Sequence, residues 1–118
     1  MNVACDWGGA LEVNESLRQL ARDLHSEGHG VFVIPALGLW EFPYEQALSD
    51  LEVPVNGIHR VRLDPPFPEA VAAAKIAMMR RLGCTVLYDD NQDNVNAVNI
   101  VGMVGVLVCG NEAVSRIC

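Results

Sequence analysis

The segment Gly-Cys-Thr-Val-Leu-Tyr-Asp-Asp-Asn, residues 83–91, decides the fold of this chain. Residues 85–88 form a short, mostly apolar run, which predicts a buried strand. Gly83 ends a helical pattern over residues 68–82, and a second helix is predicted over residues 91–101. A short buried strand between two helices is typical of a parallel sheet covered by helices.

The same pattern recurs along the rest of the chain. The predicted strands are residues 3–5, 31–34, 59–63, 85–88 and 104–108. Further helices are predicted between the N-cap Asn14 and Gly28, over residues 44–51, and after Gly110. We therefore expect an α/β fold with three layers, α/β/α and Rossmann-like, around a parallel sheet of about five strands.

Composition and charge exclude several classes of function. The 118 residues suit a single domain, 1–118, without a large cap. Fifteen acidic residues against eight basic ones give a net charge of −7, which argues against a basic surface for nucleic acid or anionic lipid. Nucleic acid is expected at most as a substrate end, and no membrane partner is expected. The absence of a signal-peptide pattern and the four scattered cysteines predict a cytoplasmic protein with reduced thiols.

Acidic residues follow two of the predicted strands. Asp6 follows the first strand, Asp89 and Asp90 follow the fourth, and Asp93 comes a few residues later. Ligands of parallel sheets bind at the carboxyl ends of the strands, and crowded carboxylates need a cation. The pattern predicts a Mg²⁺ site. The alternative is that Asp90 or Asn91 only caps the following helix while Asp89 is solvated.

Lys75 is the only lysine of the chain. On a helical wheel it falls on the apolar face of the helix predicted over residues 68–82, beside Val71 and Met79. A buried lysine needs partners for its charge, and the carboxylates at the strand ends are available. We expect Lys75 to point toward them. The alternative is a side chain that lies along the edge of the core with its ammonium in water.

The tripeptide Trp7-Gly8-Gly9 follows the first strand directly. Two glycines at such a position let backbone N–H groups approach an anion, so these residues are candidates for substrate binding. The alternative is an ordinary turn. Three aromatic residues in the long connection are expected to pack within it or to line the mouth of a cleft: Trp40, Phe42 and Tyr44.

The order of these residues resembles the haloacid dehalogenase (HAD) superfamily. Asp6, Lys75 and the pair Asp89-Asp90 follow the order of its motifs, and residues 82–91 are the most specific part of the match. The resemblance implies that Asp6 is a nucleophile that forms an aspartyl-phosphate and that Lys75 stabilises the transferring group. It further implies that Asp89 and Asp90 complete a Mg²⁺ site with Asp6. The implied function is that of a cap-less, magnesium-dependent phosphohydrolase or phosphotransferase, whose open cleft suits a phosphorylated substrate, including a macromolecular one.

Several positions depart from the family pattern Asp-x-Asp-Gly-Thr. Gly8 replaces the second aspartate, which is the general acid and base, and Ala10 replaces the threonine. Pro35 and Ala36 stand where a Ser or Thr is expected after the second strand. Because a positioned proton donor is worth about 10²–10⁴ in rate, we expect poor leaving groups to react slowly. The phosphonatase branch also lacks the second acid, but it uses a lysine of a cap domain. The alternative function is a catalytically inactive HAD-like domain that binds another protein.

Overall fold

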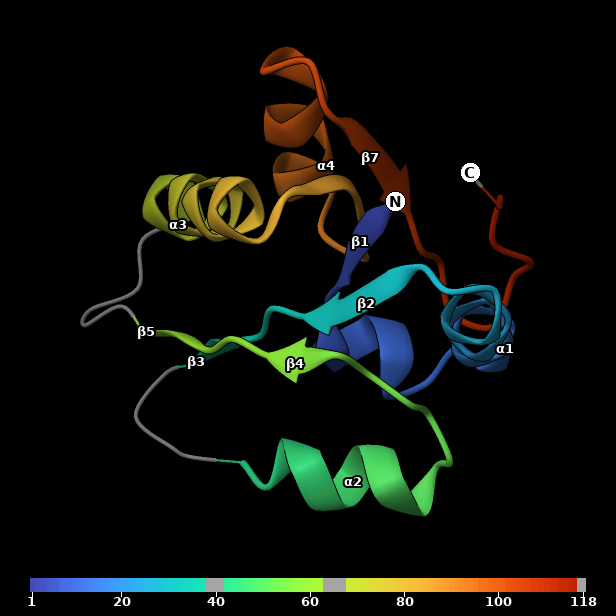
Figure 1. Cartoon of the computed structure of the whole chain (residues 1–118). Helices are drawn as coiled ribbons and strands as arrows, with labels where there is room; N and C mark the ends of the chain where they lie inside the picture. Colours follow the sequence, from blue (N-terminus) through green and yellow to red (C-terminus); the bar gives the residue numbers. More distant parts are fainter. Residues whose placement is uncertain (38–41, 63–67, 117–118) are drawn as a thin grey trace.

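The computed structural model describes residues 1–37, 42–62 and 68–116. Its main sheet has five strands, all parallel, in the order β4-β2-β1-β6-β7 (Figure 1). These strands are β1 (Asn2–Cys5), β2 (Gly30–Val33), β4 (Gly57–Ile58), β6 (Cys84–Asp89) and β7 (Val104–Leu107). The predicted α/β class and the parallel sheet of five strands are confirmed.

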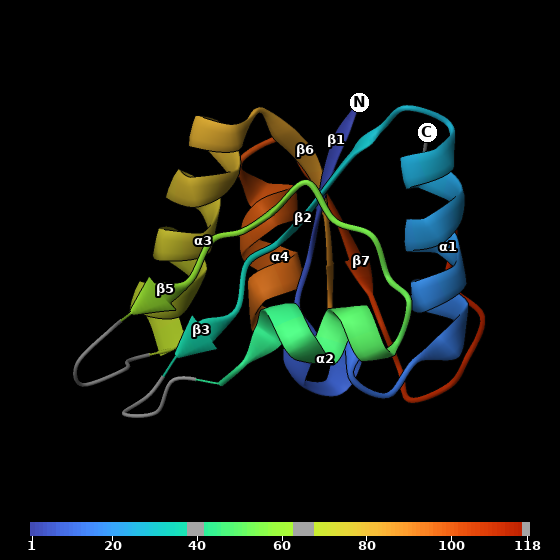
Figure 2. The ribbon, with the colours of Figure 1, turned by 60° about the horizontal axis from the view of Figure 1, so that its bottom comes forward.

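Helices cover both faces of this sheet, so that the molecule has three layers (Figure 2). The helices are α1 (Glu15–Ser26), α2 (Tyr44–Asp50), α3 (Pro68–Leu82) and α4 (Gln92–Ile100). Val3 and Cys5 of β1 pack in the core cluster that includes α1 and α2, whereas Ala4 packs in the cluster with α3 and α4. Consecutive residues of β1 thus face two different cores, which is why residues 3–5 are all apolar. None of the described helices is long and apolar enough to cross a bilayer.

The region between β2 and α3 differs from the prediction. The single strand expected over residues 59–63 is replaced by β4 and by β5 (Val61–Arg62), which pairs with β3 (Ala36–Leu37) in a separate two-stranded sheet. Pro35 accounts for the break, because it has no N–H to donate to the ladder that β2 forms. Leu63, the last residue of the predicted strand, lies outside the described residues, as does Trp40.

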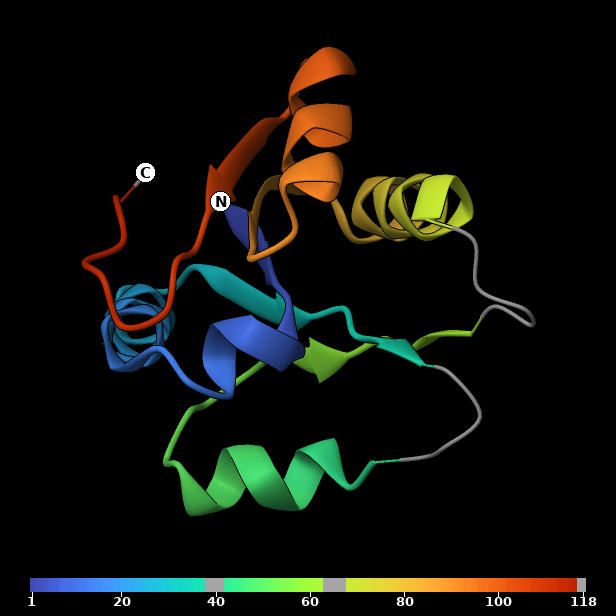
Figure 3. The ribbon, with the colours of Figure 1, turned by 180° about the vertical axis from the view of Figure 1, so that it is seen from behind.

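The described part of the C-terminal tail, residues 111–116, does not form the short helix that we predicted. It runs beside α1 instead, as Figure 3 shows from behind. The Nδ2 atom of Asn14 donates hydrogen bonds to the carbonyls of Gly110 and Glu112, at 2.5 and 3.1 Å. Its Oδ1 accepts from the Leu17 N–H at 2.8 Å, so Asn14 caps α1 as predicted.

Candidate active site

Two neighbouring strands end in carboxylates at the same edge of the sheet. Strands β1 and β6 pair in parallel with Cys5 opposite Tyr88, so Asp6 and Asp89 leave the sheet side by side. The Asp6 N–H donates to the Tyr88 carbonyl at 2.8 Å and extends the ladder to the first carboxylate. Asp90 follows at the surface, and carboxylate oxygens of the three aspartates lie within 4.8 Å of one another. The fold thus brings together the three predicted metal ligands.

Asp93, which we expected at the same rim, is not part of this cluster in the described structure. It is exposed in the first turn of α4, where an acidic residue interacts favourably with the helix dipole. The cap of α4 is Asn91, whose Oδ1 accepts from the N–H groups of Asp93 and Asn94 at 2.9 and 3.2 Å. The alternative of a solvated Asp89 is wrong, because that side chain is fully buried.

Lys75 lies between the two adjacent carboxylates. Its Nζ donates to Asp6 Oδ1 at 2.9 Å and to Asp89 Oδ2 at 3.0 Å. Because only 2% of Lys75 is exposed, its predicted inward orientation is confirmed, and the alternative with the ammonium in water is wrong. Burial on its own would lower the pKa of Lys75, but the charges of Asp6 and Asp89 outweigh it and raise that pKa above its usual value. Lys75 therefore stays a cation.

Asn94 is a residue of the site to which the sequence analysis gave no role. Its Nδ2 donates to Asp89 Oδ2 at 3.1 Å from the buried face of α4. The Asn91 N–H donates to Asp89 Oδ1 at 2.9 Å. These contacts fix the Asp89 carboxylate and leave one lone pair of its Oδ1 for a further ligand. The sequence does contain a signal for its burial, because Asn94 is next to Val95 and shares a helix face with Val98.

Asp6 has an unusual protonation equilibrium. Burial raises its pKa, the charge of Lys75 partly offsets this effect, and the charge of Asp89 and a contact with Asp90 raise the pKa further, to about 7. Without a metal ion, Asp6 therefore holds a proton more readily than an ordinary carboxyl group. A cation among the three carboxylates would favour the ionised form.

The buried thiols near the site do not offer a nucleophile. Burial raises the pKa of Cys5 to about 12, with contributions from Asp6 and Cys84, and burial raises the pKa of Cys84 to about 11. Because the thiolate is the reactive form of cysteine, both side chains are inert at neutral pH. Asp6 is the better candidate.

The donor set fits Mg²⁺ in charge and in chemistry. Three carboxylates with Lys75 among them carry a net charge of −2 when all are ionised, which one divalent cation offsets. Magnesium prefers oxygen ligands, and the three aspartates offer carboxylate oxygens within 4.8 Å of one another. Asp6, Asp90 and the remaining lone pair of Asp89 would hold the ion.

The turn after β1 gives its two glycines different surroundings. Trp7–Leu11 forms a wide helical turn, η1, in which Gly8 (φ −62°, ψ 125°) and Gly9 (φ 71°, ψ −2°) have the dihedral angles of a type II turn. A Cβ atom on Gly9 would lie 2.1 Å from Asp90 Oδ2, so the absence of a side chain lets this carboxylate pack on the turn. The Cβ position of Gly8 has no heavy atom within 4 Å.

The two glycines provide a matched pair of substitutions. We expect Gly9→Ala to lower the free energy of unfolding by about 1–2 kcal/mol or more, because alanine is strained at positive φ and also meets Asp90. Gly8→Ala should be neutral or stabilise by about 0.4–1 kcal/mol. Urea denaturation of both variants checks this. Equal effects of the two substitutions would contradict the assigned turn geometry.

The site opens into a cleft of about 400 Å³. Its charged and amide lining residues are Asp6, Lys75, Asp89, Asp90, Asn91 and Asn94, and its other lining residues are Trp7, Gly8, Pro35, Ala36, Tyr44 and Val71. Of the predicted substrate-binding residues, Trp7 and Gly8 face the cleft, whereas Gly9 packs beneath Asp90. Pro35 and Ala36 supply no side-chain hydroxyl at the wall. An anion in this cleft would therefore be recognised by Lys75, by a bound cation and by backbone N–H groups rather than by a hydroxyl group of Pro35 or Ala36.

Removal of the Lys75 charge should destabilise the protein. We expect Lys75→Met to cost about 3–5 kcal/mol at pH 8 without magnesium, because it leaves Asp6 and Asp89 without their cation. The control is Arg81→Met, which removes an exposed cation from the same helix and should change stability by about 0.5 kcal/mol at most. Chemical denaturation measures both variants. An unchanged or higher stability of Lys75→Met would contradict a charged, paired Lys75.

The raised pKa of Asp6 predicts a pH dependence of stability. Since the folded value of about 7 exceeds the ordinary value of 3.8, the folded state binds the proton more tightly, so this contribution is lost as pH rises from about 4 to about 7. In EDTA, the wild-type Tm should fall over this interval by about 5 °C more than the Tm of Asp6→Asn. Magnesium should restore the Tm more strongly above pH 7 than below it. Parallel pH profiles of the two proteins would contradict the raised pKa.

Comparisons with known proteins identify a similar fold and no activity. No protein-family model and no curated protein matches the chain. A crystal structure of an uncharacterized protein from Corynebacterium glutamicum is similar, with a TM-score of 0.63 and 23% sequence identity. The similarity covers 90% of this chain and 82% of that one. It supports the α/β fold alone.

Proposed function

We propose that this chain is a magnesium-dependent phosphohydrolase or phosphotransferase that acts through an aspartyl-phosphate at Asp6. The observation that carries the proposal is the position of Lys75 Nζ, within 3.0 Å of both Asp6 and Asp89 at the carboxyl edge of the sheet. Asp90 completes a cluster of oxygen donors that fits one divalent cation. The order of these residues along the chain also resembles the HAD superfamily.

The geometry supports different roles for the two carboxylate oxygens of Asp6. Lys75 donates a hydrogen bond to Oδ1, and in this proposal Oδ2 attacks phosphorus. A bond forms between Asp6 and phosphorus while the bond from phosphorus to the leaving oxygen breaks. Water then attacks the aspartyl-phosphate, which releases inorganic phosphate and a proton and regenerates the carboxylate. Bound by Asp6, Asp89 and Asp90, magnesium would supply positive charge beside the phosphoryl oxygens.

The proposal has a direct test with two readouts. The purified protein should release phosphate from 4-nitrophenyl phosphate in the presence of Mg²⁺. EDTA should stop this release. Mg²⁺ should also raise the Tm of the wild type more than that of Asp90→Asn, because Asp90 is an exposed member of the cluster. Turnover that persists in EDTA would overturn the dependence on a metal. Absence of both turnover and a Mg²⁺-dependent Tm shift would overturn the proposed function.

A second candidate function, an inactive domain that binds another protein, is favoured by a different surface. A groove of about 540 Å³ between α3 and α4 is lined mainly by apolar residues, and Ile100 at its rim is 84% exposed. Exposed apolar surface of this kind is common at protein interfaces. The test above separates the two functions. An inactive domain should hydrolyse no phosphate ester, and Asp6→Asn should then have no functional effect.

A further inference from the structure

Three aromatic side chains gather beside the candidate nucleophile. The ring of Trp7 lies 5.7 Å from the ring of Phe42 and 6.0 Å from that of Tyr44, and the latter two are 5.0 Å apart. These distances and their tilted or edge-on angles are those of interacting aromatic pairs. We call Trp7, Phe42 and Tyr44 the aromatic wall.

The aromatic wall borders the cleft through two of its three members. Trp7 and Tyr44 line the cleft, and Phe42, which is 41% exposed, packs against both of them. Val71 of α3 also lines the cleft. The other described lining residues away from the carboxylate cluster, Gly8, Pro35 and Ala36, are uncharged, so this part of the cleft suits an apolar, flat group.

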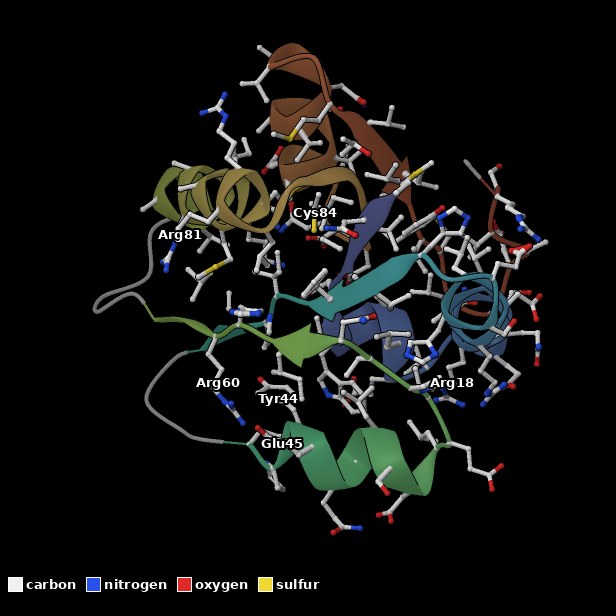
Figure 4. All side chains as sticks on the ribbon, viewed as in Figure 1. Arg18, Tyr44, Glu45, Arg60, Arg81 and Cys84 are labelled. Atoms are coloured by element: carbon white, nitrogen blue, oxygen red, sulfur yellow. The ribbon has the colours of Figure 1, made fainter. Side chains whose placement is uncertain are left out.

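The ring of Tyr44 is held in place by contacts with Arg60, which is itself paired with Glu45. Arg60 lies over the Tyr44 ring at 5.2 Å and forms a salt bridge with Glu45 at 2.9 Å. Figure 4 shows Arg60 reaching toward Glu45 at the start of α2, with Tyr44 beside them. This arrangement orders the ring without a substrate, which reduces the entropy that binding must overcome.

The chemistry of the leaving group also favours an aromatic ester. Gly8 supplies no general acid, so the leaving oxygen must depart as an anion. A phenol has a pKa of about 10, whereas an aliphatic alcohol is closer to water at about 15.7. A phenolate can therefore leave without protonation, whereas an alkoxide needs a donor, which Gly8 does not supply.

We propose that the cleft accepts phosphate monoesters of phenols, the chemistry shared by small aryl phosphates and phosphotyrosine, with the aromatic group against the aromatic wall. This inference rests on the proposed function of Asp6. Asp6 forms the bond to phosphorus, the bond from phosphorus to the aryl oxygen breaks, and the phenolate leaves with the electron pair and takes a proton from water.

The test compares two esters of equal intrinsic reactivity. Phenyl phosphate is paired with a fluorinated alkyl phosphate whose alcohol has the same pKa as phenol. We expect a KM about 2- to 12-fold lower for phenyl phosphate, the contribution of one aromatic pair. Phe42→Leu should reduce this preference, while Ile100→Ala, an exposed control at the far end of α4, should retain it. Free phosphotyrosine and a phosphotyrosine peptide, measured in parallel, distinguish the two sources of the aryl phosphate.

Binding provides a readout that needs no turnover. Calorimetry of phenyl phosphate and the fluoroalkyl ester with Asp6→Asn in Mg²⁺ should give the same preference in Kd. Equal affinity for both esters, or a preference that Phe42→Leu leaves intact, would overturn this inference even if both esters are hydrolysed. Failure to hydrolyse either ester while the aryl preference in Kd persists would overturn the proposed function alone.

Discussion

Asp6→Asn should abolish magnesium-dependent phosphate release, with a decrease in kcat on the order of 10⁴-fold or more. An amide oxygen is a poor nucleophile and forms no stable phosphoryl intermediate. The substitution preserves the shape of the side chain, and its amide oxygen can still accept the hydrogen bond that Lys75 donates to Oδ1. Because burial already disfavours the charged form of Asp6, the fold should tolerate the neutral amide.

The measurement combines steady-state phosphate release with intact-mass detection of a phosphoenzyme after rapid acid quenching. Asp93→Asn is the matched control, because Asp93 is an exposed aspartate near the same edge that lies outside the carboxylate cluster. It should keep kcat within about twofold. Turnover or a phosphoenzyme that survives Asp6→Asn would remove Asp6 from the role of nucleophile.

The sequence predicts the parallel sheet and the inward lysine for the same physical reason. Burial on both sides of a sheet favours runs of apolar residues, and residues 3–5 of β1 and 86–88 of β6 are such runs. Lys75 stands out because a cation on the apolar face of a helix requires partners. Once the strands are placed, parallel pairing brings Asp6 and Asp89 together.

The remaining features depend on tertiary structure. The division of the predicted strand 59–63 follows from the missing N–H of Pro35 on a different segment, which local alternation cannot reveal. Asn94 gains its role only because α4 turns this amide toward Asp89. Asp93 is one residue earlier on the same helix but is exposed and lies outside the carboxylate cluster, so its proximity in sequence to Asp89 and Asp90 was misleading. The different surroundings of Gly8 and Gly9 also require the coordinates, since both follow the strand as glycines.

Gly8→Asp should create the general acid that the site lacks. With φ −62° and ψ 125° the backbone accepts any L-residue, and no heavy atom lies within 4 Å of the new Cβ position. The new carboxyl group would stand in the cleft, two residues from Asp6. Neighbouring carboxylates should raise its pKa, which suits a proton donor near neutral pH. We expect kcat for alkyl phosphates to rise by about 10²–10⁴-fold.

The gain should depend on the leaving group. A phenolate departs without a proton donor, so kcat for phenyl phosphate should rise much less than kcat for an alkyl phosphate. The ratio of the two kcat values should therefore decrease. Gly8→Asn is the matched control, because it fills the same space but has no carboxyl proton to donate. An equal gain from Gly8→Asn would attribute the effect to packing in the cleft. If Gly8→Asp folds normally but does not raise kcat for alkyl phosphates, the leaving group does not lie beside Gly8.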